Sequence, residues 1–269
     1  DKSGIPDDVF DDFVEVAKPD SHYNPFKNPV IKFRNYLIVQ VLYETGFRCA
    51  ELLALRISDI GTDIDNPTLS VVRRHDSKDD PRVKEPTAKT LGRAVSITKE
   101  LRDLLNTYIK IHRADTKVAK THPFIFVSHK DKEGHYQSGQ PLIQQTINDI
   151  FKSIKGVNPE RFWAITPHSY RHYFNDQLSD QVDEERRAVR QEVKRLEQAG
   201  LHQAAKQYAD ENKITKQREL EIRAELNGHS SLKSGEIYLK RTARKQAQRI
   251  RQRMQSRMKH KTDGDYHGS

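Results

Sequence analysis

The stretch Gly228–Lys240 reads Gly-His-Ser-Ser-Leu-Lys-Ser-Gly-Glu-Ile-Tyr-Leu-Lys and places His229 and Tyr238 nine residues apart. A tyrosine hydroxyl has a pKa near about 10, so at neutral pH it attacks nothing unaided. As a nucleophile it needs a base for its proton and cations for the charge that builds on its target. Because most tyrosines simply pack with a solvated hydroxyl, the question is whether the chain supplies these helpers elsewhere.

Composition limits the class of protein. The chain has 269 residues, enough for one large domain or two small ones, and 32% of them are charged. No apolar run approaches the ~18 residues of a membrane span, and no signal-peptide pattern opens the chain. The single cysteine, Cys49, excludes an intramolecular disulfide and a cysteine-rich zinc site and fits a reducing cytoplasm.

The net charge of +9 is concentrated at the C-terminal end. From Leu239 onward the chain carries ten basic and two acidic residues, so the preceding part is almost neutral. Such a run is either a solvated tail or a surface for a polyanion. An apolar stripe runs through the same tail at steps of three or four: Ala243, Ala247, Ile250, Met254 and Met258.

Hydrophobic spacing predicts a mainly α-helical fold with a small antiparallel β-sheet in the first half of the chain, an α+β class. Helices are predicted over 30–44 with a stop at Gly46, over 50–55, after the cap Thr98, from Pro141 to before Gly156, and from Thr166-Pro167 onward. Strands are predicted over 68–74, 93–97 and 124–127. Residues 180–225 are nearly all helix formers, and Ala199-Gly200 can turn one helix back into another.

His168 and Arg171 are candidates for chemistry because they lie three residues apart and share one face of a predicted helix. Histidine can accept a proton near neutral pH, and arginine can grip a phosphate with two hydrogen bonds. A capping histidine and a surface arginine are the plainer interpretation. His168 and His172 have the spacing of two metal ligands, but no third ligand is obvious and we expect no metal site.

Arg48 is the third candidate. It follows the helix-ending Gly46 and precedes a short helix, so it lies at a junction where ligand-binding residues often occur. Glu51 is placed to pair with it or to orient it. An ordinary surface ion pair is the alternative.

Three blocks in order strongly resemble the tyrosine recombinase (phage integrase) family. They are Thr-Gly-Phe-Arg-Cys-Ala-Glu-Leu-Leu-Ala-Leu at 45–55, Thr-Pro-His-Ser-Tyr-Arg-His at 166–172, and Gly-His-Ser-Ser at 228–231 with Tyr238. The resemblance spans 30–240. It implies a tyrosine-recombinase catalytic-domain fold and a recombinase or integrase that cuts and rejoins DNA through a 3′-phosphotyrosyl bond.

The resemblance assigns roles to particular residues. Arg48 and Arg171 resemble the two arginines that hold the scissile phosphate, with Glu51 as the brace of the first. His168 resembles the histidine that assists proton transfer, and His229 the one that hydrogen-bonds the phosphate. Tyr238 matches the nucleophile.

The family also uses a hairpin lysine as general acid, and Ala-Lys-Thr-Leu-Gly-Arg at 88–93 suggests Lys89, with Lys84 in reserve. No cofactor, metal or ATP is expected, because positioned cations suffice for phosphoryl transfer and the phosphotyrosyl bond conserves energy for rejoining.

The resemblance also has departures. Family members usually carry an N-terminal helical domain, so we expect this chain to be the catalytic part of a longer protein. We expect residues 1–29 to be a linker with at most one short helix, 30–240 the catalytic domain, and 241–269 a basic tail with a helix and a disordered end. The long connection between Arg171 and His229 predicts a helical insertion at about 183–216, either a solvated hairpin or a contact with another protein.

Expected partners are a double-stranded DNA recombination site, three further copies in a homotetramer whose tails dock on neighbouring protomers, and an accessory DNA-bending protein. No membrane partner is expected, and the expected location is the bacterial cytoplasm, associated with the nucleoid. A type I topoisomerase of related chemistry and a catalytically idle DNA-binding scaffold remain as alternatives.

Overall fold

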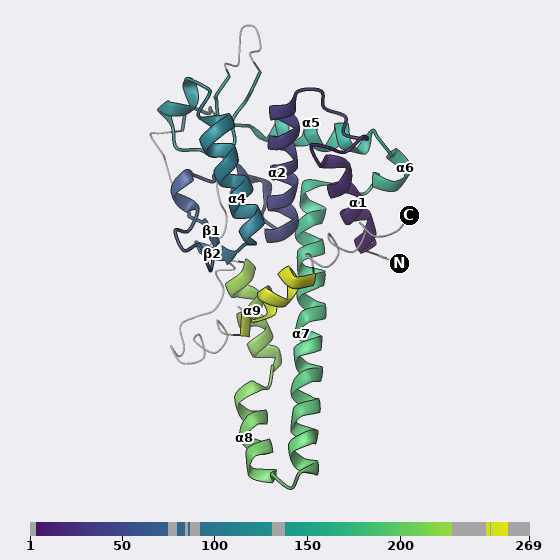
Figure 1. Ribbon diagram of the computed structural model, residues 1–269. Helices are drawn as coiled ribbons and strands as arrows, with labels where there is room; N and C mark the ends of the chain where they lie inside the picture. Colours follow the sequence, from purple (N-terminus) through teal and green to yellow (C-terminus); the bar gives the residue numbers. More distant parts are fainter. Residues whose placement is uncertain are drawn as a thin grey trace. The chain divides into compact units, whose positions relative to one another are not determined.

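The chain forms two compact units, residues 1–174 and 175–269 (Figure 1). The computed structural model describes residues 4–74, 80–83, 86, 92–130, 138–227, 246–247 and 249–257. Helix α7 (Pro167–Gln198) contributes residues to both units. The division after Phe174 differs from the expected catalytic domain of 30–240, whose C-terminal boundary lies outside the described residues, so those domain boundaries stay a prediction.

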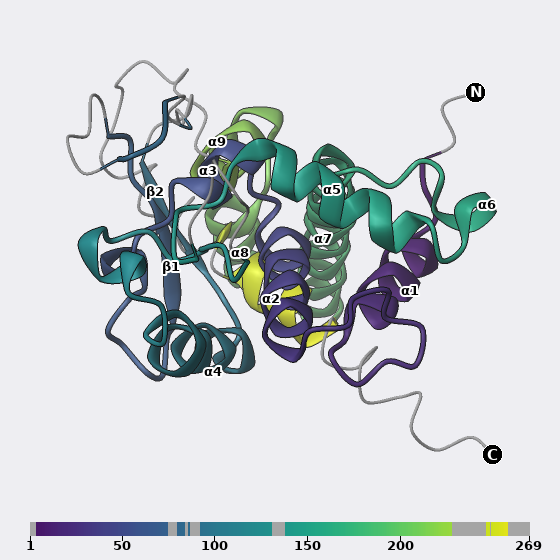
Figure 2. The same cartoon turned by 90° about the horizontal axis from the view of Figure 1, so that it is seen from above.

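Unit 1 is built around helix α2 (Pro29–Thr45). Asn28 caps this helix by accepting hydrogen bonds from the backbone N–H groups of Val30 and Ile31, and Pro29 occupies the first turn. Seen from above, α2 lies between α4 (Lys99–Thr107) and α1 (Asp7–Ala17), and α5 (Gln144–Lys155) crosses nearby (Figure 2). The long helix predicted for 30–44 is therefore the centre of this unit.

An aromatic cluster lies in the core of unit 1, and α1 contributes to it. The Phe13 ring centroid lies 5.2 Å from that of Phe151 and 5.3 Å from that of Phe162 in α6 (Pro159–Phe162), while Phe10 lies 5.2 Å from Tyr170. Phe13 has no exposed surface. The short helix expected within residues 1–29 is α1, and its apolar face is buried in the unit, so 7–17 pack as part of unit 1.

The sheet is small. Strands β1 (Thr68–Val71) and β2 (Arg93–Ser96) pair antiparallel, with Thr68 opposite Ser96 and Val71 opposite Arg93. The predicted strand at 124–127 makes only isolated bridges, to Arg56 and Pro141. Because Pro141 takes part in this bridge, it is not helical. Helix α5 therefore begins at Gln144 and not at Pro141 as predicted.

Short helical segments connect these elements. They are α3 (Cys49–Leu53), two 3₁₀ turns (Ile57–Asp59 and Val118–Thr121) and a π-helical segment (Tyr108–Arg113) that continues α4. Thr98 caps α4 by accepting a hydrogen bond from the Leu101 N–H, as predicted.

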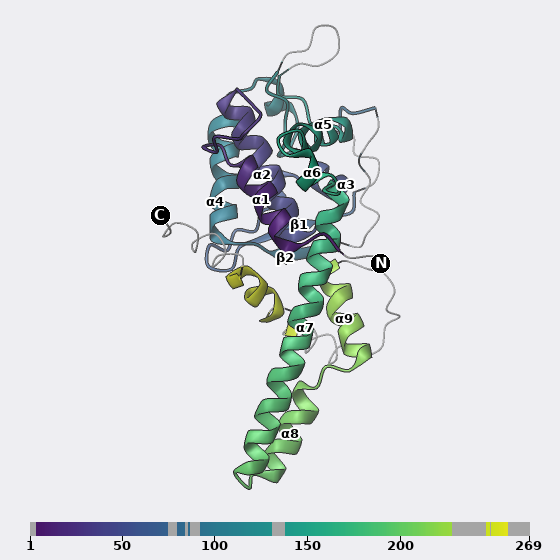
Figure 3. The same ribbon diagram turned by 90° about the vertical axis from the view of Figure 1, so that its right-hand side faces the viewer.

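Unit 2 is an all-helical assembly among its described residues. Helix α7 ends before Gly200, whose φ of 75° lets the chain reverse into α8 (His202–Asn212), and α9 (Lys216–Asn227) follows. Figure 3 shows α8 beside the C-terminal part of α7. Residues 183–216 cover the C-terminal part of α7 and all of α8, and the interpretation of this stretch as an insertion stays a prediction.

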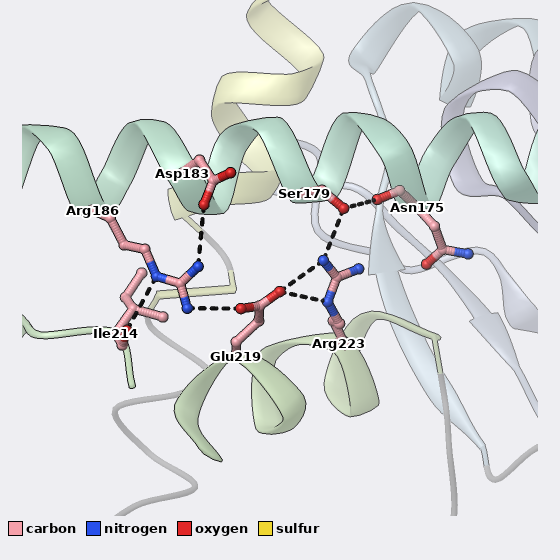
Figure 4. Close-up of polar contacts among 7 residues, drawn as sticks. All are labelled: Asn175, Ser179, Asp183, Arg186, Ile214, Glu219 and Arg223. Carbon is pink, nitrogen blue, oxygen red and sulfur yellow. Dashed lines mark hydrogen bonds and ion pairs between the residues drawn. The ribbon is translucent and has the colours of Figure 1, made fainter. Parts of the chain in front are cut away.

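Arginine–carboxylate contacts join α7 to α9 (Figure 4). Arg186 Nη2 lies 2.7 Å from Glu219 Oε2, and Arg223 Nη2 lies 2.8 Å from Glu219 Oε1. Arg223 also donates a 2.8 Å hydrogen bond to Ser179 Oγ. One carboxylate therefore holds two arginines, one from each helix.

The described part of the basic tail is helical over 249–257. Its stripe residues Ala247, Ile250 and Met254 are buried, while Arg253 pairs with Glu185 and Arg257 with Glu184 of α7. This part of the stripe is thus buried within a single chain, and docking on a neighbour stays a prediction. The expected disordered end, beyond 257, lies outside the described residues.

The fold class is confirmed: the chain is mainly helical with a small antiparallel sheet. Within the described ranges, no helix combines the length and apolarity needed to cross a membrane.

Candidate active site

The end of α2 sets the first boundary of the candidate site. Gly46 caps this helix with a φ of 60°, and its N–H donates to the Leu42 carbonyl at 2.9 Å. A Cβ at this position would lie 2.6 Å from the Cβ of Phe174 in α7. Only glycine fits both the left-handed backbone and this close approach, which brings the start of α3 against α7.

Glu51 is the centre of the charged cluster that follows. Its carboxylate accepts a 2.8 Å hydrogen bond from the backbone N–H of Arg48 and lies 3.4 Å from Arg48 Nη1. Arg93 binds the same carboxylate with both terminal nitrogens, at 3.1 and 3.0 Å. Glu51 is only 1% exposed, so its charge requires these partners.

Arg48 keeps access to solvent. Its side chain is 32% exposed, whereas that of Arg93 is 4% exposed and lies over the Phe47 ring at 5.1 Å. Arg93 therefore holds Glu51, and Glu51 in turn positions Arg48, the arginine that an outside anion can reach. This is the bracing role expected for Glu51.

Arg171 lies on α7, close enough to this cluster to respond to its charges. Its Nη1 donates a 3.0 Å hydrogen bond to the Gly46 carbonyl, and the side chain is buried. Burial, followed by the charge of Arg48, lowers the pKa of Arg171 to about 10, and Glu51 opposes that shift. Arg171 is therefore still cationic at neutral pH. Arg48 and Arg93 bind the Glu51 carboxylate and Arg171 is influenced by its charge, so three arginines are associated with one carboxylate and leave a local excess of positive charge.

His168 stands in the first turn of α7, and its side chain is exposed. Partial burial, then the charges of His172, Arg171 and Arg48, lower the pKa of His168 below its usual value. The histidine is consequently neutral at physiological pH and able to accept a proton. The arrangement of Arg48, Arg171 and His168 can neutralise an anion and remove a proton beside it.

His172 lies close to His168, with ring centroids 4.6 Å apart and perpendicular planes. The side chain of His172 is exposed. Across the described ranges, no group of three or more His, Cys, Asp or Glu side chains is arranged to hold a metal ion.

Four predicted residues lie outside the described part of the chain: Lys84, Lys89, His229 and Tyr238. The structure thus brings together Arg48, Arg171 and His168 and leaves the positions of the expected general acid and nucleophile as predictions.

Arg93 was missed as a site residue, since the sequence shows it only as the first residue of a strand. The need of Glu51 for a further cationic partner follows from its burial, which only the structure shows. Trp163 is 75% exposed, whereas Tyr170, Tyr173 and Phe174 are buried.

Comparison with known proteins identifies relatives of this chain. The model of the phage integrase family matches residues 21–186. Transposase A from transposon Tn554 of Staphylococcus aureus is 32% identical over 146 residues, which are 54% of this chain and 36% of that protein. Tyrosine recombinase XerD of Halalkalibacterium halodurans is 26% identical over 146 residues, 54% of this chain and 40% of that protein. The chain thus spans about two fifths of the length of these relatives.

Two solved structures also show similarity. XerH site-specific recombinase bound to difH substrate, in a pre-cleavage complex, aligns with a TM-score of 0.47 and 20% identity over 64% of this chain and 41% of that chain. XerA recombinase aligns with a TM-score of 0.42 and 24% identity over 66% of this chain and 49% of that chain.

Proposed function

Because the chain belongs to the phage integrase family, we propose that it is a site-specific recombinase that cuts and rejoins double-stranded DNA through a phosphotyrosyl intermediate. The observation that carries the proposal is the cluster in which Glu51 and Arg93 hold Arg48 near Arg171 and His168. The names of the relatives, a transposase and a tyrosine recombinase, support a DNA substrate.

The arginines act on the scissile phosphate. Phosphoryl transfer asks mainly for positioning and for neutralisation of charge on the nonbridging oxygens. Arg48 and Arg171 bind those oxygens, and His229 adds a hydrogen bond. Because Arg48 is braced by a buried carboxylate, it is held in place before the substrate arrives.

The covalent step involves two proton transfers, one from the nucleophile to a base and one from an acid to the leaving group. The Tyr238 oxygen attacks phosphorus while its proton passes to His168, and the bond between phosphorus and the 5′ oxygen breaks. The leaving 5′ oxygen takes a proton from Lys89, or from Lys84 if the hairpin register differs. The products are a 3′-phosphotyrosyl bond and a free 5′-hydroxyl, and attack by a 5′-hydroxyl reverses the step. The bond energy is conserved, so rejoining needs neither ATP nor a metal.

Assembly follows from the same proposal. Two DNA duplexes require four active sites, so a homotetramer on synapsed DNA is the working state, with an accessory DNA-bending protein as a further partner. The basic tail provides charges for DNA phosphates or for a neighbouring copy.

Covalent trapping tests the proposal. Duplexes enriched from a random pool for binding to the chain are nicked close to the protected centre, so that the small 5′-hydroxyl fragment is lost after cleavage and rejoining fails. We expect the wild type to form a protein–DNA adduct that survives a denaturing gel and Tyr238→Phe to form none. Tyr23→Phe, at a tyrosine that is 68% exposed in the structure, is the matched control and should keep the adduct.

The other outcomes separate the alternatives. Specific DNA binding without any adduct would identify an idle scaffold, and relaxation of supercoiled DNA without strand exchange would identify a topoisomerase. An adduct that persists in Tyr238→Phe would mean that another residue is the nucleophile.

A further inference from the structure

Away from the candidate active site, α7 carries an ordered row of charges within unit 2. Three aspartates come first, followed by three basic residues: Asp176, Asp180, Asp183, Arg187, Arg190 and Lys194. All six side chains are exposed. At 3.6 residues per turn they fall within an arc of about 80° of the helix surface, so they form one narrow face.

The order of these charges is unfavourable for a helix standing alone. Like charges follow one another at steps of three or four within each half, and such neighbours destabilise a helix. The helix dipole does not account for the order, because its effect is confined to the terminal turns and Asp176 lies beyond the first two turns of α7. A partner outside the unit would relieve the repulsion.

Contacts inside the unit leave most of the row available. Asp183 Oδ1 lies 3.1 Å from Arg186 of the same helix, but the other five side chains make no ion pair with any described residue. The adjacent strip of α7 contacts α9, because Ser179 and Arg186 bind residues of that helix (Figure 4). The charged row borders this strip, and its own six side chains remain exposed.

The row is symmetric about position 185. Asp176 and Lys194 lie equally far from that position along the helix, as do Asp180 and Arg190, and Asp183 and Arg187. If a second α7 is laid antiparallel against the first with both helices level at residue 185, every aspartate meets a basic residue. A twofold axis makes each of these three pairs twice, as in any isologous contact.

We propose that two copies of this chain associate through this face of α7, antiparallel and related by a twofold axis at the level of residue 185. A second copy fits better than nucleic acid, because the aspartate half would repel a polyanion. The contact is made of exposed ion pairs, so it is weak and sensitive to salt. The inference does not depend on the proposed function, although copies held together on one DNA would populate the contact more fully.

Reversing the charges of the three aspartates in one variant, and of the three basic residues in another, tests the proposed pairing of the two helices. One variant carries Asp176→Lys, Asp180→Lys and Asp183→Lys; a second carries Arg187→Glu, Arg190→Glu and Lys194→Glu. Sedimentation equilibrium at low ionic strength should show self-association of the wild type that weakens in about 1 M salt, where the screening length is about 3 Å. Each variant alone should associate at least about tenfold more weakly, since like charges then face each other.

The combined samples distinguish the contact from simple damage to the fold. An equal mixture of the two variants should form heterodimers, and a chain carrying all six reversals should self-associate like the wild type. Circular dichroism checks that each variant is folded. A wild type that stays monomeric at low salt overturns the proposal. Self-association that survives the half reversals, or that the mixture and the sixfold variant fail to restore, overturns it equally.

Discussion

Unit 1 adds aromatic ring contacts to its aliphatic core, whereas unit 2 adds arginine–carboxylate contacts between helices to an aliphatic core of its own. Phe10, Phe13 and Phe151 make ring contacts in unit 1, and among the described residues every aromatic ring pair lies there. In unit 2 the described helices share Glu219, Glu184 and Glu185 as acceptors for arginines. Packing of rings is insensitive to salt, while partly exposed ion pairs are weak and screened. The ring contacts of unit 1 should therefore respond less to salt than the arginine–carboxylate contacts of unit 2.

The largest expected effect follows from neutralising the one buried carboxylate of the cluster. Glu51→Gln removes the charge that compensates Arg93 and Arg48, so we expect a loss of about 3 kcal/mol in the free energy of unfolding. Chemical denaturation measures it. Glu192→Gln removes a carboxylate that lies 2.6 Å from Arg195 in an exposed pair of unit 2, and it should cause no measurable change. Equal effects of the two changes would contradict the contrast between the units.

The two positive-φ glycines at helix ends offer a second comparison. Gly46→Ala adds a Cβ at 2.6 Å from Phe174 on a left-handed backbone, so strain and overpacking together should cost about 3 kcal/mol. Gly200→Ala in unit 2 has φ 75° and no atom within 4 Å, so strain alone should cost about 1 kcal/mol. Thermal and denaturant unfolding of both variants gives the difference. A Gly46→Ala cost no larger than that of Gly200→Ala would show that Phe174 moves aside.

Lowering the pH should weaken the contact between α7 and α9 in unit 2 by protonating Glu219. Partial burial alone raises the pKa of Glu219, but hydrogen bonds from Arg223 and Arg186 outweigh it and hold the pKa below the usual 4.5. The ionised Glu219 carboxylate therefore stabilises the folded state fully above about pH 4.5. This stabilisation is lost as the pH falls through the lower pKa that Glu219 has in the folded state. Amide hydrogen exchange in α9, corrected for its intrinsic pH dependence, should become faster at low pH, corresponding to a fall of up to about 1 kcal/mol in the free energy of opening. Glu219→Gln should abolish this pH dependence, while exchange in α2 should not change.

The smallest expected effect concerns His168. Partial burial and the charges of His172, Arg171 and Arg48 lower its pKa, so the neutral form persists as the pH falls below 6.5. The folded state disfavours the protonated imidazole of His168. The folded state therefore loses stability only when the pH drops below the pKa that His168 has in the unfolded chain. His172→Gln should raise the pKa of His168, measured by NMR titration of its ring proton. His22→Gln is the control, since His22 does not contribute to that shift; an equal shift in both variants would rule out a local cause.

Local signals predicted much of the fold. Gly46, Thr98 and Thr166-Pro167 mark helix ends through their own backbone and side chains, and the structure places helix ends at each of them. Pro141 failed as a signal because its bridge to Val127, a contact distant in sequence, decides its conformation. The first residues of the chain are acidic and contain proline, so the sequence did not predict that α1 packs in the core. The apolar face of α1 is identified by its burial in the structure.

The candidate site was predictable where a motif carries it. The order of the sequence blocks indicated that Arg48, Arg171 and His168 belong together. Burial is the main cause of the lowered pKa values of Arg171 and His168, and the charge of Arg48 adds to both shifts. Arg93 could not be found in this way, because its contact with Glu51 depends on how a strand is placed beside α3. No local pattern at Arg93 announces that placement.

The fit of Gly46 against Phe174 has an evolutionary consequence. Two stretches of the gene that lie far apart encode one steric arrangement, in which a missing side chain at position 46 makes room for an aromatic ring at position 174. Arg171 donates a hydrogen bond to the backbone carbonyl of Gly46, so this contact depends on the backbone at position 46 and not on a side chain. Substitutions of the surrounding side chains are therefore tolerated as long as Gly46 is kept. Among related sequences, we expect position 46 to depart from glycine only where position 174 has become small.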